Sequence, residues 1–131
     1  MAPVNLVFFR EASGKAPVVQ WLEDLRRGDR KALMKCVAAI KRLAACGHEL
    51  RRPIADYLRE DIYELRIKCR HVNFRVFYFF HGRTVAVLTN GLAKEGAVPA
   101  EEIDRAIRRR EMFRSNPELY TYEEPENSWL H

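Results

Sequence analysis

The chain of 131 residues is long enough for one domain with a hydrophobic core and too short for two. Its hydrophobic fraction of 47% and charged fraction of 31% argue against a chain that is disordered throughout. The net charge of +5 is unevenly divided, because residues 1–113 hold 22 basic and 14 acidic side chains, whereas residues 114–131 hold one basic and four acidic ones. We therefore expect a basic domain over residues 1–113, which favours polyanionic partners such as nucleic acid, and an acidic, aromatic-containing tail over residues 114–131.

The three cysteines, Cys36, Cys46 and Cys69, form an odd set without Cys-x-x-Cys spacing, which argues against both a disulfide framework and a zinc site. A reducing, cytoplasmic environment is the expectation. The first ten residues show no signal-peptide pattern, and no apolar run approaches the roughly 18 residues that span a bilayer. We expect neither secretion nor a membrane partner, and no metal or cofactor.

The first predicted elements are a strand and two helices. The apolar run over residues 4–9 indicates a strand buried on both faces. Pro17 then begins a helix that ends at Gly28. Asp29 caps a second helix, whose apolar stripe ends at Gly47. These two helices are expected to form an antiparallel hairpin.

The second half of the chain predicts a sheet and one further helix. After a loop at residues 50–54, alternating patterns predict strands at residues 61–69, 72–80 and 84–90, which form a three-stranded antiparallel meander. A loop between two glycines, Gly91 and Gly96, carries Lys94, and Pro99 begins the last helix. Acidic residues open this helix and arginines follow, an order that matches the helix dipole and needs no functional explanation.

The most informative feature is the hairpin around Arg70 and His71. If these two residues form the turn, Arg66 lies directly opposite Arg75, on the sheet face that does not hold the core. Like charges paired across strands destabilise a sheet unless an anion lies between them. A nucleic-acid phosphate would serve, because guanidinium groups bind phosphate bidentately. The alternative is a surface ion pair of either arginine with Glu64, which would contribute little.

The same register sorts the other hairpin residues. The core face holds Tyr63, Leu65, Ile67, Phe74, Val76 and Tyr78. The charged face holds Glu64, Arg66, Lys68, Asn73 and Arg75. Phe77 and Phe79 share the charged face, so another element covers part of it or it offers rings for stacking on bases.

Four segments in this order carry a resemblance to a known family: Tyr63-Glu-Leu-Arg66, Phe74-Arg-Val-Phe-Tyr78, Val87-Leu-Thr-Asn-Gly-Leu-Ala-Lys94 and Pro99-Ala-Glu-Glu-Ile-Asp-Arg-Ala-Ile-Arg-Arg109. Over about residues 5–113 the chain resembles the RelE/ParE toxin superfamily, in its HigB-like, phage-derived branch. The resemblance implies an α+β, RelE-like fold with an N-terminal strand, a two-helix hairpin, a three-stranded antiparallel meander and a C-terminal helix.

Members of that superfamily are toxins of type II toxin–antitoxin systems, and many cut mRNA on the ribosome. The resemblance implies a metal-independent endoribonuclease in which the RNA 2′-hydroxyl attacks the adjacent phosphate, with a helix-turn-helix antitoxin as the partner. Arg66, Arg75 and Lys94 would stabilise the developing charge, and Glu64 would act as a base or orient the arginines. The expected RNA-binding residues are Lys68, Arg70, His71, Asn73 and Arg109.

The chain also departs from the family pattern. It has Leu92 where an aromatic residue commonly follows the glycine, and Glu95 in place of a second lysine. Two alternatives stay open: a ParE-like toxin that inhibits DNA gyrase without cutting RNA, and an inactive prophage remnant that only binds nucleic acid. Cleavage of translated mRNA separates the first hypothesis from both, and inhibition of supercoiling separates the two alternatives.

Overall fold

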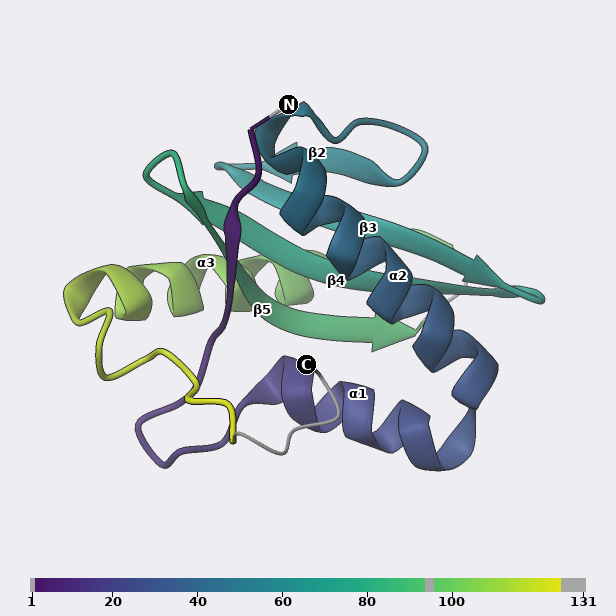
Figure 1. Ribbon diagram of the computed structural model, residues 1–131, viewed down its shortest axis with the longest axis horizontal. Coiled ribbons are helices and arrows are strands. Elements are labelled where there is room, and N and C mark those ends of the chain that lie inside the picture. Colours follow the sequence, from purple (N-terminus) through teal and green to yellow (C-terminus); the bar gives the residue numbers. More distant parts are fainter. Residues whose placement is uncertain (1, 94–95, 126–131) are drawn as a thin grey trace.

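A computed structural model describes residues 2–93 and 96–125. Within these residues, five strands form one mixed sheet in the order β1-β5-β4-β3-β2, and three α-helices pack on it (Figure 1). The strands are β1 (Asn5–Phe8), β2 (Ala55–Arg59), β3 (Ile62–Cys69), β4 (Val72–His81) and β5 (Val85–Ala93). The helices are α1 (Pro17–Gly28), α2 (Arg30–Cys46), followed by the 3-10 turn η1 (Gly47–Glu49), and α3 (Ala100–Ser115).

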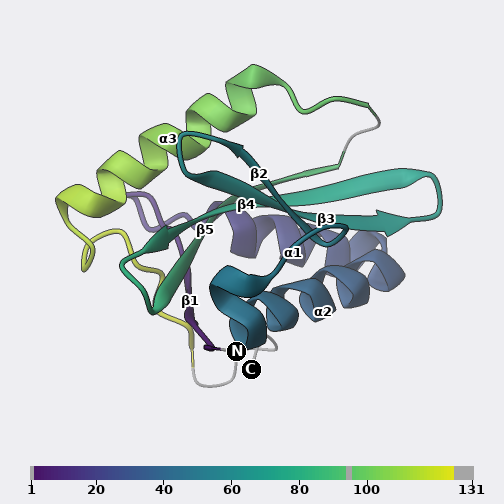
Figure 2. The same ribbon diagram turned by 90° about the horizontal axis from the view of Figure 1, so that it is seen from above.

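The sheet is covered on both faces, with α1 and α2 on one side and α3 on the other (Figure 2). The larger core lies under the helix hairpin and includes Leu22, Leu43, Leu65, Val76, Tyr78 and Leu88. The smaller core lies under α3 and includes Phe9, Ile62, Phe77, Phe79, Val87 and Phe113. The sequence left open whether Phe77 and Phe79 are covered by another element or stack on bases. Helix α3 covers both rings, so neither is available to stack on a base.

The helix hairpin begins and ends where the sequence predicts. Pro17 opens α1, where its missing N–H costs no hydrogen bond. The carboxylate of Asp29 then accepts the backbone N–H of Ala32 at 3.2 Å and caps α2. None of the helices in the described part of the chain is long and apolar enough to cross a membrane.

The predicted register of the central hairpin is confirmed. Arg70 and His71 form the turn between β3 and β4, and Arg70 takes the left-handed conformation with φ 59°. Arg66 pairs with Arg75, and Tyr63 pairs with Tyr78. The two charged side chains therefore face each other as the alternation requires.

The predicted three-stranded meander is incomplete: β3, β4 and β5 pair antiparallel as expected, and β2 adds a fourth antiparallel strand. It reaches β3 through a tight turn at Glu60 and Asp61, which both have positive φ, 49° and 63°. Two-residue hairpin turns favour this conformation, but usually with Asn and Gly. Because Glu60 and Asp61 are not typical residues of such a turn, the sequence did not predict it. The guanidinium of Arg110 on α3 supports the turn by donating to the Glu60 carbonyl.

Two further strand predictions need correction. β1 is an edge strand that pairs in parallel with β5, and its side chains are only partly buried rather than enclosed on both faces. β5 continues through Gly91, which pairs with Val76, so this glycine lies in a strand and not at a loop boundary. A Cβ at Gly91 would lie 2.4 Å from Cδ2 of Trp21, so the close packing of α1 on β5 requires glycine.

The segment after α3 returns to the sheet beside β1. Phe9 and Thr121 form an isolated antiparallel bridge, and the ring of Tyr120 stacks on Phe9 with centroids 5.7 Å apart. Trp129, one of the aromatic residues of the expected tail over residues 114–131, lies outside the described residues.

Candidate active site

The charged face of the hairpin contains its own anion. Nη1 of Arg75 on β4 donates to Oε1 of Glu64 on β3 at 3.1 Å, and Nε of Arg66 lies 3.8 Å from Oε2 of the same carboxylate. Glu64 therefore sits between the two facing arginines. The like-charge pair is compensated within the protein, and the expected surface ion pair is instead a largely buried one.

The two arginines differ in exposure. The Arg75 side chain is 11% exposed and also donates from Nη2 to the carbonyl of Gly96 at 3.1 Å, in the loop before α3. The Arg66 side chain is 43% exposed, and among the described residues its ion pair is the longer contact with Glu64. It also acts electrostatically on Asp56. Arg75 is thus held by two acceptors, whereas Arg66 presents a guanidinium to solvent that can accept a new anionic partner.

Burial raises the pKa of the Glu64 carboxyl above its ordinary value, although both arginines act in the opposite direction. Desolvation penalises the charged form, and this effect exceeds the attraction of the two guanidinium groups. A carboxyl in this state exchanges a proton closer to neutral pH than an exposed glutamate does. The arrangement therefore combines a proton-transfer group with an accessible cation on one sheet face.

A second carboxylate, Asp56, belongs to the same face and was missed in the sequence. It lies on β2 directly opposite Glu64. Nη2 of Arg52 holds it at 2.9 Å, and this hydrogen bond lowers the pKa of Asp56. Asp56 could be found only with β2 in place, because the strand pairing is what brings it beside Glu64.

Residues 21–111 of the chain match the family described as "Phage derived protein Gp49-like (DUF891)". The chain belongs to this Gp49-like family. The family is of the RelE-like toxin type, which agrees with the coarser part of the resemblance drawn from the sequence. A search of curated proteins finds no match.

Glu64, Arg66, Arg75 and Asp56 together are called the Glu64 cluster below. The matched region of this Gp49-like chain contains all four residues. It excludes β1 and the segment after Glu111. Lys94, predicted as a catalytic residue, lies outside the described residues, as does Glu95.

The predicted RNA-binding residues at the hairpin tip separate into two groups. Lys68 and Asn73 pair with each other across the strands and continue the charged face beyond Arg66. Arg70 instead donates to the carboxylate of Asp29 at 2.7 Å, towards the face that carries α2. His71 is exposed in the turn.

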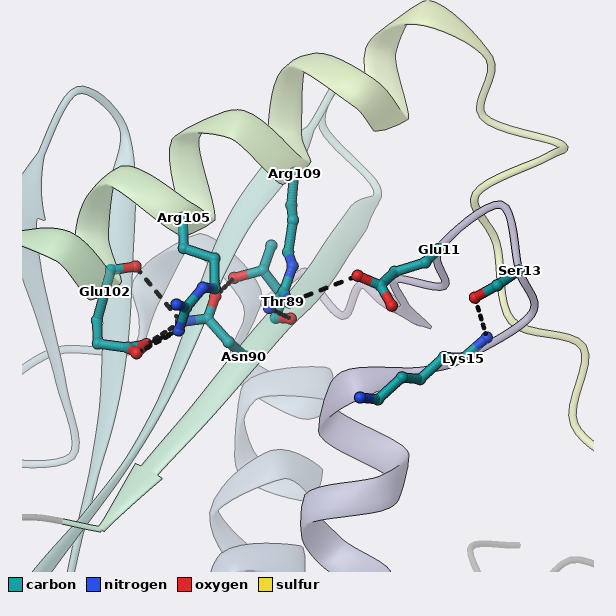
Figure 3. A network of polar contacts seen from close by, with 8 residues as sticks. All are labelled: Glu11, Ser13, Lys15, Thr89, Asn90, Glu102, Arg105 and Arg109. Atoms are coloured by element: carbon teal, nitrogen blue, oxygen red, sulfur yellow. Dashed lines mark hydrogen bonds and ion pairs between the residues drawn. The ribbon is translucent and has the colours of Figure 1, made fainter.

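Arg109 lies in a different environment from the Glu64 cluster. It donates to the Thr89 carbonyl at 3.0 Å, and Oε2 of Glu11 lies 4.0 Å from its Nη2 (Figure 3). Its guanidinium carbon also lies 5.8 Å from the centroid of the Phe9 ring. Burial lowers the pKa of Arg109. Its described contacts hold α3 against β5 and the loop after β1. Its expected role in RNA binding stays a prediction.

The arginines of α3 also have structural partners that the helix dipole alone did not predict. Arg105 donates to both carboxylate oxygens of Glu102, and Nδ2 of Asn90 donates to the same carboxylate at 3.3 Å (Figure 3). The hydroxyl of Thr89 donates to Oδ1 of Asn90 at 2.7 Å. A polar Asn90 inside an apolar strand was the sequence signal for this network. Among the described residues, no group of three or more His, Cys, Asp or Glu side chains is arranged to hold a metal ion.

Proposed function

We propose that this Gp49-like chain is the toxin of a type II toxin–antitoxin system, of the HigB-like type, and acts in the cytoplasm as a ribosome-dependent mRNA endonuclease. The observation that carries the proposal is the buried Glu64 between Arg75 and the exposed Arg66. Membership of a RelE-like toxin family supports the toxin role. The partner in this proposal is a helix-turn-helix antitoxin that masks the charged face.

In the proposed reaction, the 2′-hydroxyl of one nucleotide attacks the adjacent phosphorus and the bond to the 5′-oxygen of the next nucleotide breaks. Arg66 binds the non-bridging phosphate oxygens, where negative charge grows in the transition state. The Glu64 carboxylate takes the proton from the 2′-hydroxyl. Arg75 is a positioning residue, because its contacts with Glu64 and Gly96 hold the carboxylate on the sheet face where the proposal places the phosphate.

This assignment changes the roles expected from the sequence, where both arginines stabilise the developing charge on the phosphate. The exposed Arg66 has a free side of its guanidinium, while Arg75 already uses Nη1 and Nη2 within the protein. The resemblance implies that Lys94 stabilises the developing charge, and in this proposal it also protonates the leaving 5′-oxygen.

The decisive experiment adds purified protein to a reconstituted translation reaction and maps mRNA ends by primer extension. Wild type should cut translated mRNA, and Arg66→Ala should slow cleavage by about 100-fold to 1,000-fold, the usual loss on removing one transition-state donor. Arg83→Ala is the matched control, because Arg83 is an exposed arginine in the turn between β4 and β5. Inhibition of gyrase supercoiling with intact mRNA would support the ParE-like alternative, and neither activity would support the inactive remnant.

A further inference from the structure

The C-terminal segment occupies the outer edge of the sheet beside β1. The N–H of Tyr122 donates to the Phe8 carbonyl at 2.9 Å, and the N–H of Arg10 donates to the Tyr120 carbonyl at 2.9 Å. Phe9 and Thr121 form the only bridge of this pairing within the described residues. The rest of β1, up to Val7, has β5 on one side and no described strand on the other. The edge is therefore able to pair with an extended chain, and residues 120–122, within the described part of the tail, pair with one end of it.

An apolar hollow of about 210 Å³ adjoins this edge. Its apolar lining comes from β1, α1 and α2, through Leu6, Phe8, Leu22, Val37 and Ile40. Lys41 of α2 and Tyr122 and Glu124 of the tail also line it. The tail thus brings an aromatic ring and a carboxylate to a hollow with an apolar floor and a basic side chain.

The hollow continues along the outer side of α2. Val37 and Lys41 also line a second hollow, next to Met34, whose side chain is 72% exposed. All charged residues of helix α2 are basic, and it contains no acidic residue: Arg30, Lys31, Lys35, Lys41 and Arg42. A surface that joins exposed apolar groups to a row of basic side chains is suited to a segment carrying apolar and acidic side chains.

We propose that the outer edge of β1 and the adjoining surface of α2 form a docking site for an acidic, extended segment of a partner protein. The segment adds antiparallel to β1, places an apolar side chain in the hollow and aligns carboxylates with Lys41. It takes the place of residues 120–124, which already show this mode of binding in cis. Strand addition of this kind draws affinity from main-chain hydrogen bonds and specificity from alternate side-chain pockets.

The docking site is separate from the Glu64 cluster, which lies on the sheet face covered by α3 rather than at the β1 edge. β1 and the tail also lie outside the region that matches the Gp49-like family. A partner bound here would leave the charged hairpin face open, so this inference does not depend on RNA cleavage.

The test measures binding of a fluorescein-labelled peptide with the sequence of residues 116–125 to the full-length protein by fluorescence anisotropy. In wild type the tethered tail competes at an effective concentration in the millimolar range, so the peptide binds weakly. Tyr122→Pro removes the N–H that donates to Phe8 and should tighten peptide binding by at least about tenfold. Glu123→Pro is the matched control, because Glu123 is exposed and makes no described backbone bond to β1.

Charge specificity is tested in the Tyr122→Pro background. Lys41→Glu should weaken peptide binding by at least about tenfold, whereas Lys31→Glu, a reversal on the same helix outside both hollows, should change it little. A peptide with glutamine in place of Glu118, Glu123 and Glu124 should bind less tightly. If Tyr122→Pro does not fold, Tyr120→Ala, which removes the stacking on Phe9, replaces it. The docking site would be overturned if the peptide bound wild type and the Tyr122→Pro or Tyr120→Ala variant with equal affinity, or did not bind at all. Equal effects of Lys41→Glu and Lys31→Glu on peptide affinity would overturn it as well.

Discussion

Arg75 and Glu64 form an ion pair across β3 and β4 with side chains only 11% and 4% exposed, while Arg66, on the other side of the same carboxylate, is 43% exposed. One carboxylate thus has a buried partner and an accessible one. Removing each partner has a different physical consequence, because an unpaired charge is tolerated in water and is costly in the interior.

Arg75→Ala should lower the free energy of unfolding by about 3–5 kcal/mol, because it leaves the Glu64 carboxylate buried without its closest cation. Arg66→Ala should lower it by about 1 kcal/mol or less, as expected for a long, half-exposed pair. Urea unfolding of both variants measures the difference. The double variant Arg75→Ala/Glu64→Gln should recover part of the loss, and equal losses in the two single variants would show that Arg75 is not the buried partner.

Glu64→Gln should change how stability depends on pH. The pKa of Glu64 is raised in the folded protein above its ordinary 4.5, so the folded state binds this proton more tightly than the unfolded state. The contribution of Glu64 is therefore fully present below about 4.5 and is lost as pH rises through the folded pKa. Urea unfolding from pH 4 to 7 should show wild type losing stability relative to Glu64→Gln over this interval. A constant difference between the two proteins would contradict the raised pKa.

Gly91→Ala should destabilise the protein by about 1–3 kcal/mol, because the added methyl group meets three atoms of the Trp21 ring within 2.8 Å. Gly28→Ala is the matched control, since a Cβ there has no neighbour within 4 Å. Thermal and urea unfolding measure both effects. The smaller ring of Trp21→Phe should relieve part of the cost in the double variant; a loss unaffected by that change would point to the strand backbone instead of the ring.

Cleavage by the wild type should leave a 2′,3′-cyclic phosphate or 3′-phosphate end and should continue in the presence of EDTA, because the proposed nucleophile belongs to the RNA. Enzymatic end analysis on the cut mRNA distinguishes these ends from a 3′-hydroxyl. The chelator must be titrated so that the ribosomes stay intact, since they require magnesium. A 3′-hydroxyl product would contradict the proposed role of Glu64 as the base for a 2′-hydroxyl.

The sequence by itself determined the helix hairpin and the register of the central strands. Pro17 and Asp29 mark helix starts through local chemistry, and the Arg70-His71 turn sets the pairing of β3 with β4. Strand alternation then places Arg66 opposite Arg75 whatever the rest of the fold does. These features depend on neighbours within a few residues or across one tight turn.

Tertiary structure decided which of the facing arginines is buried, and that distinction divides their proposed roles. Arg75 is enclosed because the loop before α3 supplies the Gly96 carbonyl as an acceptor. Arg66 has no such described contact with this loop, and its side chain stays exposed. Strand β2, with Asp56 beside Glu64, depends on an acidic turn supported by Arg110, 50 residues further along the chain. Neither contact leaves a local pattern, because each joins segments that become neighbours only after the sheet and α3 have packed together.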